Sequence, residues 1–84
     1  MFRVFYDERA VEDLAALDSS LRATVIGSIG RKLTTSPTRF GKPLRGSLFG
    51  VWSLRVGDWR VLYRIEKQTV IIARIGHRRE VYGR

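Results

Sequence analysis

The first third of the chain changes from the hydrophobic spacing of a strand to that of a helix. Aromatic and β-branched residues alternate with other residues over positions 2–6, which is typical of a β-strand. Asp7 then stands where a helix N-cap belongs, and apolar side chains recur every three or four positions over residues 8–17. A second stripe with a spacing of four runs over residues 21–33. The pattern predicts a strand followed by a helical hairpin.

The second half of the chain has the period of two that is typical of strands. Residues 51–56 and 59–65 each alternate apolar with other side chains, and Gly57-Asp58 between them is a two-residue hairpin signal. Residues 69–75 are more uniformly apolar, which predicts a central strand. The order β-α-α-β-β-β predicts an α+β fold, in which a small antiparallel four-stranded sheet carries the N-terminal helical hairpin on one face.

A two-residue turn also fixes which residues of the hairpin face each other, and their numbers then sum to 115. On one face Arg55 lies directly opposite Arg60, with β-carbons about 5 Å apart, and like charges so placed cost stability. The two arginines either splay into water, where they repel each other weakly, or indicate a function for their face. The other face is apolar and available to the helices. The apolar face comprises Trp52, Leu54, Val56, Trp59, Val61 and Tyr63, and the opposite face comprises Val51, Ser53, Arg55, Arg60, Leu62 and Arg64.

The charge of the chain is strongly positive and unevenly placed. Sixteen Lys and Arg against eight Asp and Glu give a net charge of +8, and 13 of the 16 basic residues are arginines. Residues 1–18 carry two basic and five acidic residues, a net charge of −3, whereas residues 19–84 carry 14 basic and three acidic residues, a net charge of +11. Such segregation favours a polyanionic partner, namely nucleic acid, an anionic membrane or an acidic protein, over a merely soluble basic domain. Arginine in particular offers phosphate a planar fork.

Several classes of protein are excluded by what the chain lacks. It has no cysteine and one histidine, His77, so that disulfide bonds, thiolate metal sites and histidine metal clusters are excluded, and no cofactor is expected. No apolar run approaches the roughly 18 residues of a membrane span, and the first residues do not resemble a signal peptide. A length of 84 residues with 44% hydrophobic residues predicts a single folded domain, 1–84, in the cytoplasm.

The C-terminal segment 76–84, called the tail below, adds a dense group of polar side chains to the end of the last strand. It contains one histidine, three arginines and one tyrosine, namely His77, Arg78, Arg79, Arg84 and Tyr82. If the strand ends near the polar hairpin face, these groups converge with Arg55 and Arg60 on one phosphate-sized site. The arginines would neutralise a pentavalent phosphate, while Tyr82 would stack on an unpaired base or, alternatively, pack on the sheet edge.

The order of elements and three segments of the sequence resemble the RelE/ParE toxin superfamily. The segments are Gly41-Lys-Pro-Leu-Arg-Gly46, Trp52-Ser-Leu-Arg-Val-Gly-Asp-Trp-Arg-Val-Leu-Tyr63 and Ile75-Gly-His-Arg-Arg-Glu-Val-Tyr82. The resemblance implies a toxin of a type II toxin–antitoxin pair with a RelE-like fold. RelE-like members enter the ribosomal A site and cleave mRNA without a metal. There the 2′-hydroxyl attacks the adjacent phosphate and leaves a cyclic phosphate and a free 5′-hydroxyl.

The resemblance also implies roles for individual residues. The hairpin arginine that stabilises the transition state falls on Arg60, and the tail arginine that acts as general acid or phosphate clamp falls on Arg78. The base-stacking tyrosine falls on Tyr82. The basic residues expected to touch RNA are Lys42, Arg45, Arg55, Arg64 and Arg79.

The sequence departs from this family pattern at two positions. The pattern has two lysines on the strand before the hairpin turn, and Val51 and Ser53 occupy those positions here. Because histidine is the side chain that titrates near neutral pH, we expect His77 to substitute as general base or acid, with Tyr82 as the other group able to transfer a proton. Arg79 is an alternative for part of the role of Arg78.

Three functions are compatible with this resemblance. The favoured one is a ribosome-dependent endoribonuclease acting on mRNA. The alternatives are a ParE-like inhibitor of DNA gyrase without nuclease activity and an inactive module that keeps the toxin fold, because a shared fold does not separate them. In each case the expected partner is a cognate acidic antitoxin, RelB-like, in a heteromeric complex, and for the nuclease also the ribosome and mRNA. No membrane partner is expected.

Overall fold

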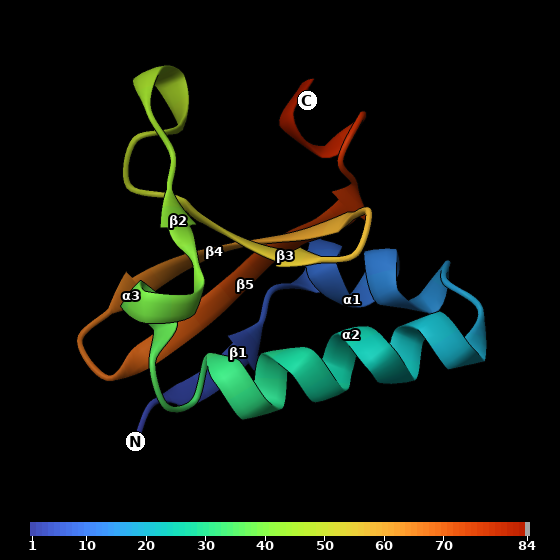
Figure 1. Ribbon diagram of the computed structural model, residues 1–84, viewed down its shortest axis with the longest axis horizontal. Coiled ribbons are helices and arrows are strands. Elements are labelled where there is room, and N and C mark those ends of the chain that lie inside the picture. Colours follow the sequence, from blue (N-terminus) through green and yellow to red (C-terminus); the bar gives the residue numbers. More distant parts are fainter. Residues whose placement is uncertain (84) are drawn as a thin grey trace.

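The structure, a computed structural model, describes residues 1–83. Within this range five strands form one sheet in the order β1-β5-β4-β3-β2, and α1 and α2 cover one of its faces (Figure 1). The strands are β1 (Arg3–Tyr6), β2 (Lys42–Pro43), β3 (Trp52–Val56), β4 (Trp59–Glu66) and β5 (Thr69–His77). The helices are α1 (Glu8–Ala15), α2 (Ser19–Lys32) and the short α3 (Pro37–Phe40), and η1 (Gly46–Leu48) and η2 (Val81–Gly83) are single 3₁₀ turns.

The predicted α+β class, with a helical hairpin on one face of a small sheet, is confirmed. Two details of the predicted sheet are wrong. β1 runs parallel to β5, with Tyr6 opposite Ile72, so that the sheet is mixed. A fifth strand, β2, places Lys42 opposite Ser53 at the other edge. Periodicity shows which residues share a face but not which strands are neighbours, and a two-residue strand containing a proline has no alternation to detect.

The predicted hairpin register is confirmed along the whole of β3. Trp52 pairs with Tyr63 and Arg55 with Arg60, and Gly57 in the turn has a φ of 61°, which suits glycine in this type of hairpin. The expected central strand is also confirmed, because β5 lies between β1 and β4. A bulge opposite Leu62 and Tyr63 shifts the register between β4 and β5.

The hydrophobic core lies between the helices and the apolar face of the sheet. The inward stripes of α1 and α2 meet the predicted apolar hairpin face and the inward side chains of β5. Its most buried members are Ala10, Leu14, Val25, Ile29, Leu33, Leu54, Val61, Tyr63, Val70, Ile72 and Ile75. Asp18 caps α2 by accepting a 2.9 Å hydrogen bond from the Leu21 amide. Arg22 of α2 donates to the Leu14 and Leu17 carbonyls at 2.9 and 2.7 Å, and so satisfies the end of α1.

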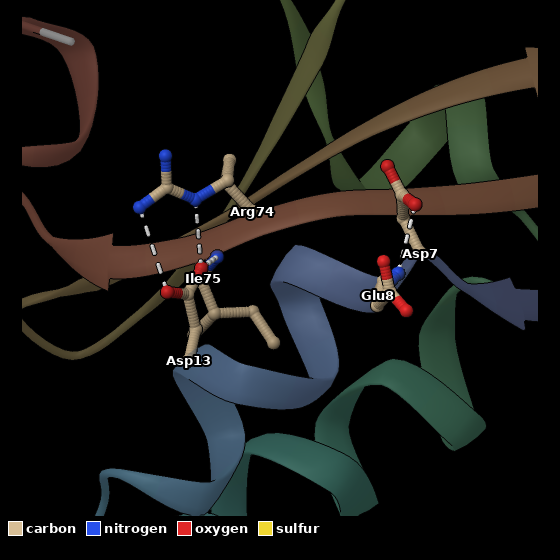
Figure 2. A network of polar contacts seen from close by, with 5 residues as sticks. All are labelled: Asp7, Glu8, Asp13, Arg74 and Ile75. Atoms are coloured by element: carbon tan, nitrogen blue, oxygen red, sulfur yellow. Dashed lines mark hydrogen bonds and ion pairs between the residues drawn. The ribbon is translucent and has the colours of Figure 1, made fainter.

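One edge of β5 is open where β1 ends, and a side chain of α1 closes it. Asp13 accepts hydrogen bonds from the backbone amide of Ile75 at 2.8 Å and from Arg74 Nε at 2.9 Å (Figure 2). The hydrogen bond to Asp13 raises the pKa of the Arg74 guanidinium above its usual value. The carboxylate therefore satisfies a strand amide that no neighbouring strand reaches, and it ties α1 to the sheet. No helix among residues 1–83 has the length and apolar character needed to cross a bilayer.

Candidate functional site

The sheet face away from the helices, called the open face below, carries the paired arginines. In the register of β3, β4 and β5, Arg55 lies opposite Arg60 and Arg60 lies opposite Gly76. Two segments project from this side of the sheet, the loop between β2 and β3 and the C-terminal tail (Figure 1). The open face is therefore bordered at two places by chain that follows a strand end, where function is often found.

Two of the predicted site residues gather at the hairpin turn between β3 and β4. The Arg60 guanidinium donates to the backbone carbonyls of Gly57 and Trp59 at 2.9 and 3.0 Å. The Arg78 amide donates to the Asp58 carbonyl at 2.9 Å, and its guanidinium Nε lies 3.9 Å from Asp58 Oδ1. Both side chains are at least partly exposed, so that they retain donors for an anion such as phosphate.

The tail folds back over the open face and brings Tyr82 onto it. Val81 is 8% exposed and packs on Gly76, where an added β-carbon would lie 3.1 Å from the Val81 Cβ. The Tyr82 hydroxyl is 2.8 Å from Ser53 Oγ, and its side chain remains 38% exposed. A hydrogen bond and a buried valine thus hold an accessible phenol beside β3. The open face of the described residues therefore presents guanidinium groups and a phenol together.

His77 is not brought to the open face, contrary to the expected convergence. It pairs with Trp59, whose ring it meets edge to face at 5.6 Å between centroids, and its Nδ1 accepts from the Arg79 amide at 3.2 Å. Side chains alternate along β5, so that Gly76 shares the face of Arg60 and His77 the face of the helices. His77 also borders a pocket of about 560 Å³ at the end of β5, which Gly76 and Val81 line as well and whose polar lining is Arg9, Asp13, Arg74, His77 and Glu80.

The residues expected to touch RNA are spread over several parts of the open side. Lys42 lies opposite Ser53 and is exposed, and Arg45 is exposed at the start of η1 in the projecting loop. Arg64 is four residues from Arg60, or about 13 Å along β4, where its Nε lies 3.6 Å from Glu66 Oε2. Arg79 is exposed in the tail. Arg84, counted among the tail arginines, lies outside the described residues.

Sequence reasoning missed three residues that position this site. Gly76 leaves room for the Val81 side chain, Ser53 is hydrogen-bonded to the Tyr82 hydroxyl, and the Asp58 carbonyl accepts a hydrogen bond from the Arg78 amide. No sequence signal placed Gly76 beside Arg60, because that pairing follows from the bulge between β4 and β5. Within residues 1–83, no group of three or more histidine, aspartate or glutamate side chains is placed to hold a metal ion.

Comparisons with known proteins give the class of this chain. The family model described as "ParE toxin of type II toxin-antitoxin system, parDE" matches residues 4–82. The chain is 39% identical over 85 residues to Toxin RelG of Mycobacterium tuberculosis, covering 99% of this chain and 98% of that protein. It is 37% identical over 65 residues to Toxin RelE of the same organism, covering 77% and 67%. The chain therefore belongs to the RelE/ParE superfamily of type II toxin–antitoxin toxins.

The fold supports the same family assignment. The crystal structure of the toxin–antitoxin complex RelBE2 from M. tuberculosis contains a chain that superimposes with a TM-score of 0.87 at 38% identity, covering 90% of each chain. The predicted membership in this superfamily is confirmed.

Proposed function

We propose that this toxin is a ribosome-dependent endoribonuclease that cleaves mRNA in the A site and so inhibits translation in the cytoplasm. The observation that carries the proposal is the arrangement of Arg60, Arg78 and Tyr82. The two arginines flank the turn after β3, and the phenol lies on the same face, hydrogen-bonded to Ser53 of that strand. The similarity to Toxin RelG and Toxin RelE supports the same branch of the superfamily.

The reaction needs stabilisation of charge at the phosphate and two proton transfers. The 2′-oxygen of a ribose forms a bond to the adjacent phosphorus as the bond from phosphorus to the 5′-oxygen breaks. The 2′-hydroxyl loses one proton and the departing 5′-oxygen gains one, so that the products are a cyclic phosphate and a 5′-hydroxyl. Negative charge grows on the phosphate oxygens during this step, and the guanidinium groups of Arg60 and Arg78 would stabilise it. Basic side chains around them, including Arg55, would hold the RNA backbone.

Proton transfer is assigned first to Tyr82 and second to His77. Tyr82 is on the open face with its hydroxyl in a hydrogen bond, and its ring is exposed enough to stack on a base. His77 is at the end of β5 on the other face, against Trp59. Both assignments predict loss of cleavage in the corresponding variant, and the proposal ranks Tyr82→Phe as the more damaging of the two.

Primer extension on an mRNA under translation, with purified toxin added, tests the assignment. Wild-type protein should cut within A-site codons, and Arg60→Ala and Arg78→Ala should each slow cutting by about a hundredfold, the usual effect of removing one charge-stabilising donor. Arg31→Ala, an exposed arginine on α2, is the matched control and should cut like wild type. Absence of A-site cuts by wild-type protein would reject the nuclease, and unchanged cutting by Arg60→Ala with Tyr82→Phe would reject the roles.

A second candidate function is inhibition of DNA gyrase without RNA cleavage. The family description that matches residues 4–82 names a ParE toxin, which favours this alternative over an inactive module. Expression of the toxin should then cause gyrase-trapped DNA breaks while mRNA remains intact. Arg60→Ala would separate the functions, because the nuclease alone places that guanidinium at a reacting phosphate.

The proposed partner in the resting cell is an acidic RelB-like antitoxin. The similar M. tuberculosis chain was crystallised as a toxin–antitoxin complex, and the open side of this chain is basic. An acidic segment that orders on this side would cover the arginines at the entropic cost usual for coupled folding. If a short acidic reading frame lies beside the toxin gene, co-expression with its product should yield one complex on size exclusion and relieve growth inhibition.

A further inference from the structure

We propose that Lys42 is a catalytic residue of the open face, whose ε-ammonium group contacts the reacting phosphate. The inference rests on the proposed endoribonuclease activity. It adds a catalytic residue on β2, a strand that the sequence did not predict. β2 places Lys42 directly opposite Ser53, and directly opposite residues of an antiparallel pair point to the same side of the sheet. Ser53 Oγ in turn is hydrogen-bonded to Tyr82.

The spacing of residues within the sheet puts the middle of the site within reach of the amine. The β-carbons of Lys42 and Ser53 are about 5 Å apart across the strands, and Arg55 is the next open-face residue of β3, about 7 Å further along. A flexible four-carbon side chain that begins there covers the space between the Tyr82 hydroxyl and Arg55. Arg60 and Arg78 reach the same phosphate from the hairpin turn, so that the reacting group would be held from two sides.

The segment that carries Lys42 is fixed by the core. The buried Tyr63 hydroxyl donates to the Pro37 carbonyl at 2.6 Å, at the start of α3. Gly41 then passes against the same hydroxyl, where a β-carbon would overlap it. The glycine that precedes Lys42 is therefore required by this close passage, and the position of the lysine is set by a buried aromatic residue of β4.

The other two lysines of the chain are held elsewhere. Lys32 ends α2, with Nζ 5.7 Å from the centroid of the Phe40 ring. Lys67 is in the turn between β4 and β5, with a φ of 57°. Among the three lysines, all of which lie within residues 1–83, only Lys42 is paired with a residue that contacts Tyr82. An ammonium beside guanidinium groups adds a compact, movable charge for an oxyanion that forms during the reaction.

Single-turnover cleavage of a ribosome-bound mRNA by saturating toxin tests this assignment. Lys42→Ala should reduce the cleavage rate by about a hundredfold with ribosome binding within threefold of wild type, whereas Lys42→Arg, which keeps the charge, should lose less than tenfold. Lys67→Ala is the matched control and should cut like wild type. Circular dichroism melting checks that the variants fold.

A transposed lysine makes the test specific to position. Lys42→Ala with Ser53→Lys returns the amine to the same patch from the neighbouring strand, and it should cut at least ten times faster than Lys42→Ala with Ser53→Ala, which also lacks the Tyr82 contact. The proposal is overturned if Lys42→Ala cuts within threefold of wild type, if its defect is entirely in binding, or if the transposed lysine gives no gain. A wild-type protein that does not cut at all rejects the endoribonuclease itself, which is a different outcome.

Discussion

Gly76 is the single residue on which the position of the tail depends. It occupies a site in the row of Arg55 and Arg60 where any side chain would point onto the open face. Because glycine has none, Val81 fills the space and the following Tyr82 reaches Ser53. A residue without side-chain chemistry therefore decides where a candidate catalytic group lies.

Gly76→Ala should displace the tail. The new β-carbon would lie 3.1 Å from the Val81 Cβ, and such overpacking costs about 1–3 kcal/mol when neighbours cannot move fully. Urea unfolding should show part of this loss, and limited proteolysis should cut the tail of the variant faster. Gly30→Ala on α2 is the control, since a β-carbon there meets nothing within 4 Å and should raise stability by up to about 1 kcal/mol. Equal proteolysis of the tail in wild type and Gly76→Ala would contradict this account.

Tyr63 predicts a pH dependence of stability. Burial raises the pKa of its phenol above the ordinary value of 10.0, so the folded state keeps this proton to higher pH than the unfolded state does. The stabilisation is complete below pH 10 and decreases as the pH rises toward the folded-state pKa, by at most about 1.4 kcal/mol per pH unit. Urea midpoints between pH 9 and 11 should fall more steeply for wild type than for Tyr63→Phe. Parallel slopes would show that Tyr63 is not responsible.

At the scale of elements, β5 is the strand that the rest of the fold is built around. It is paired on both sides over only part of its length. β1 covers its first half, and Asp13 of α1 takes over where β1 ends (Figure 2). The uniformly apolar sequence of residues 69–75 predicted its central place. The parallel partner was not predictable from alternation, because α1, α2, α3 and three strands separate β1 from β5 along the chain.

Asp13→Ala should weaken this junction. It removes the acceptor of the Ile75 amide and the partner of Arg74, and an unsatisfied, partly buried donor costs about 1–3 kcal/mol. Chemical unfolding would measure the loss, and hydrogen exchange should accelerate at Ile75 before it does at Val61. Glu12→Ala, at an exposed neighbouring position of α1, should change stability by less than about 0.5 kcal/mol. A loss equal for both variants would count against a specific role of Asp13.

At the scale of the whole molecule, charge separates by layer. Residues 1–36, which form β1 and the helical layer, carry five basic and five acidic residues and have no net charge. Residues 37–83, which form the remaining strands and both projecting segments, carry ten basic and three acidic residues, a net charge of +7. From the sequence alone, the boundary between acidic and basic segments was placed at residue 18. In the structure the boundary between the layers is near residue 36, because the basic residues of α2 offset the acidic residues of α1.

Salt should slow association with an acidic antitoxin. Surface charges attract a partner over about 10 Å at 0.1 M salt and over less as salt increases, so the association rate should fall about tenfold between 50 and 500 mM NaCl. Stopped-flow fluorescence of the tryptophans would measure it. Replacement of Arg45 and Arg55 by glutamine should flatten the dependence, whereas Arg31→Gln on α2 should leave it steep. A rate that does not change with salt would remove the electrostatic explanation.

The sequence predicted the face of each hairpin residue but not the convergence of the site. A period of two and a two-residue turn are local, so Arg55 and Arg60 could be paired from the chain alone. The places of Tyr82 and Lys42 depend on contacts with Ser53, which is 29 residues before the tyrosine and 11 after the lysine. The face of His77 could not be predicted in this way, because the bulge between β4 and β5 interrupts the alternation and moves His77 to the helix side.

The division of charge between the layers affects how the toxin is oriented as it approaches a target. A molecule whose helical layer is neutral and whose remaining strands and projecting segments carry +7 has an electric moment directed from the helices toward the sheet. Near a ribosome, or any other dense array of phosphates, the field exerts a torque as well as a pull. The toxin would turn while still diffusing, so that most of its collisions begin with the open face forward.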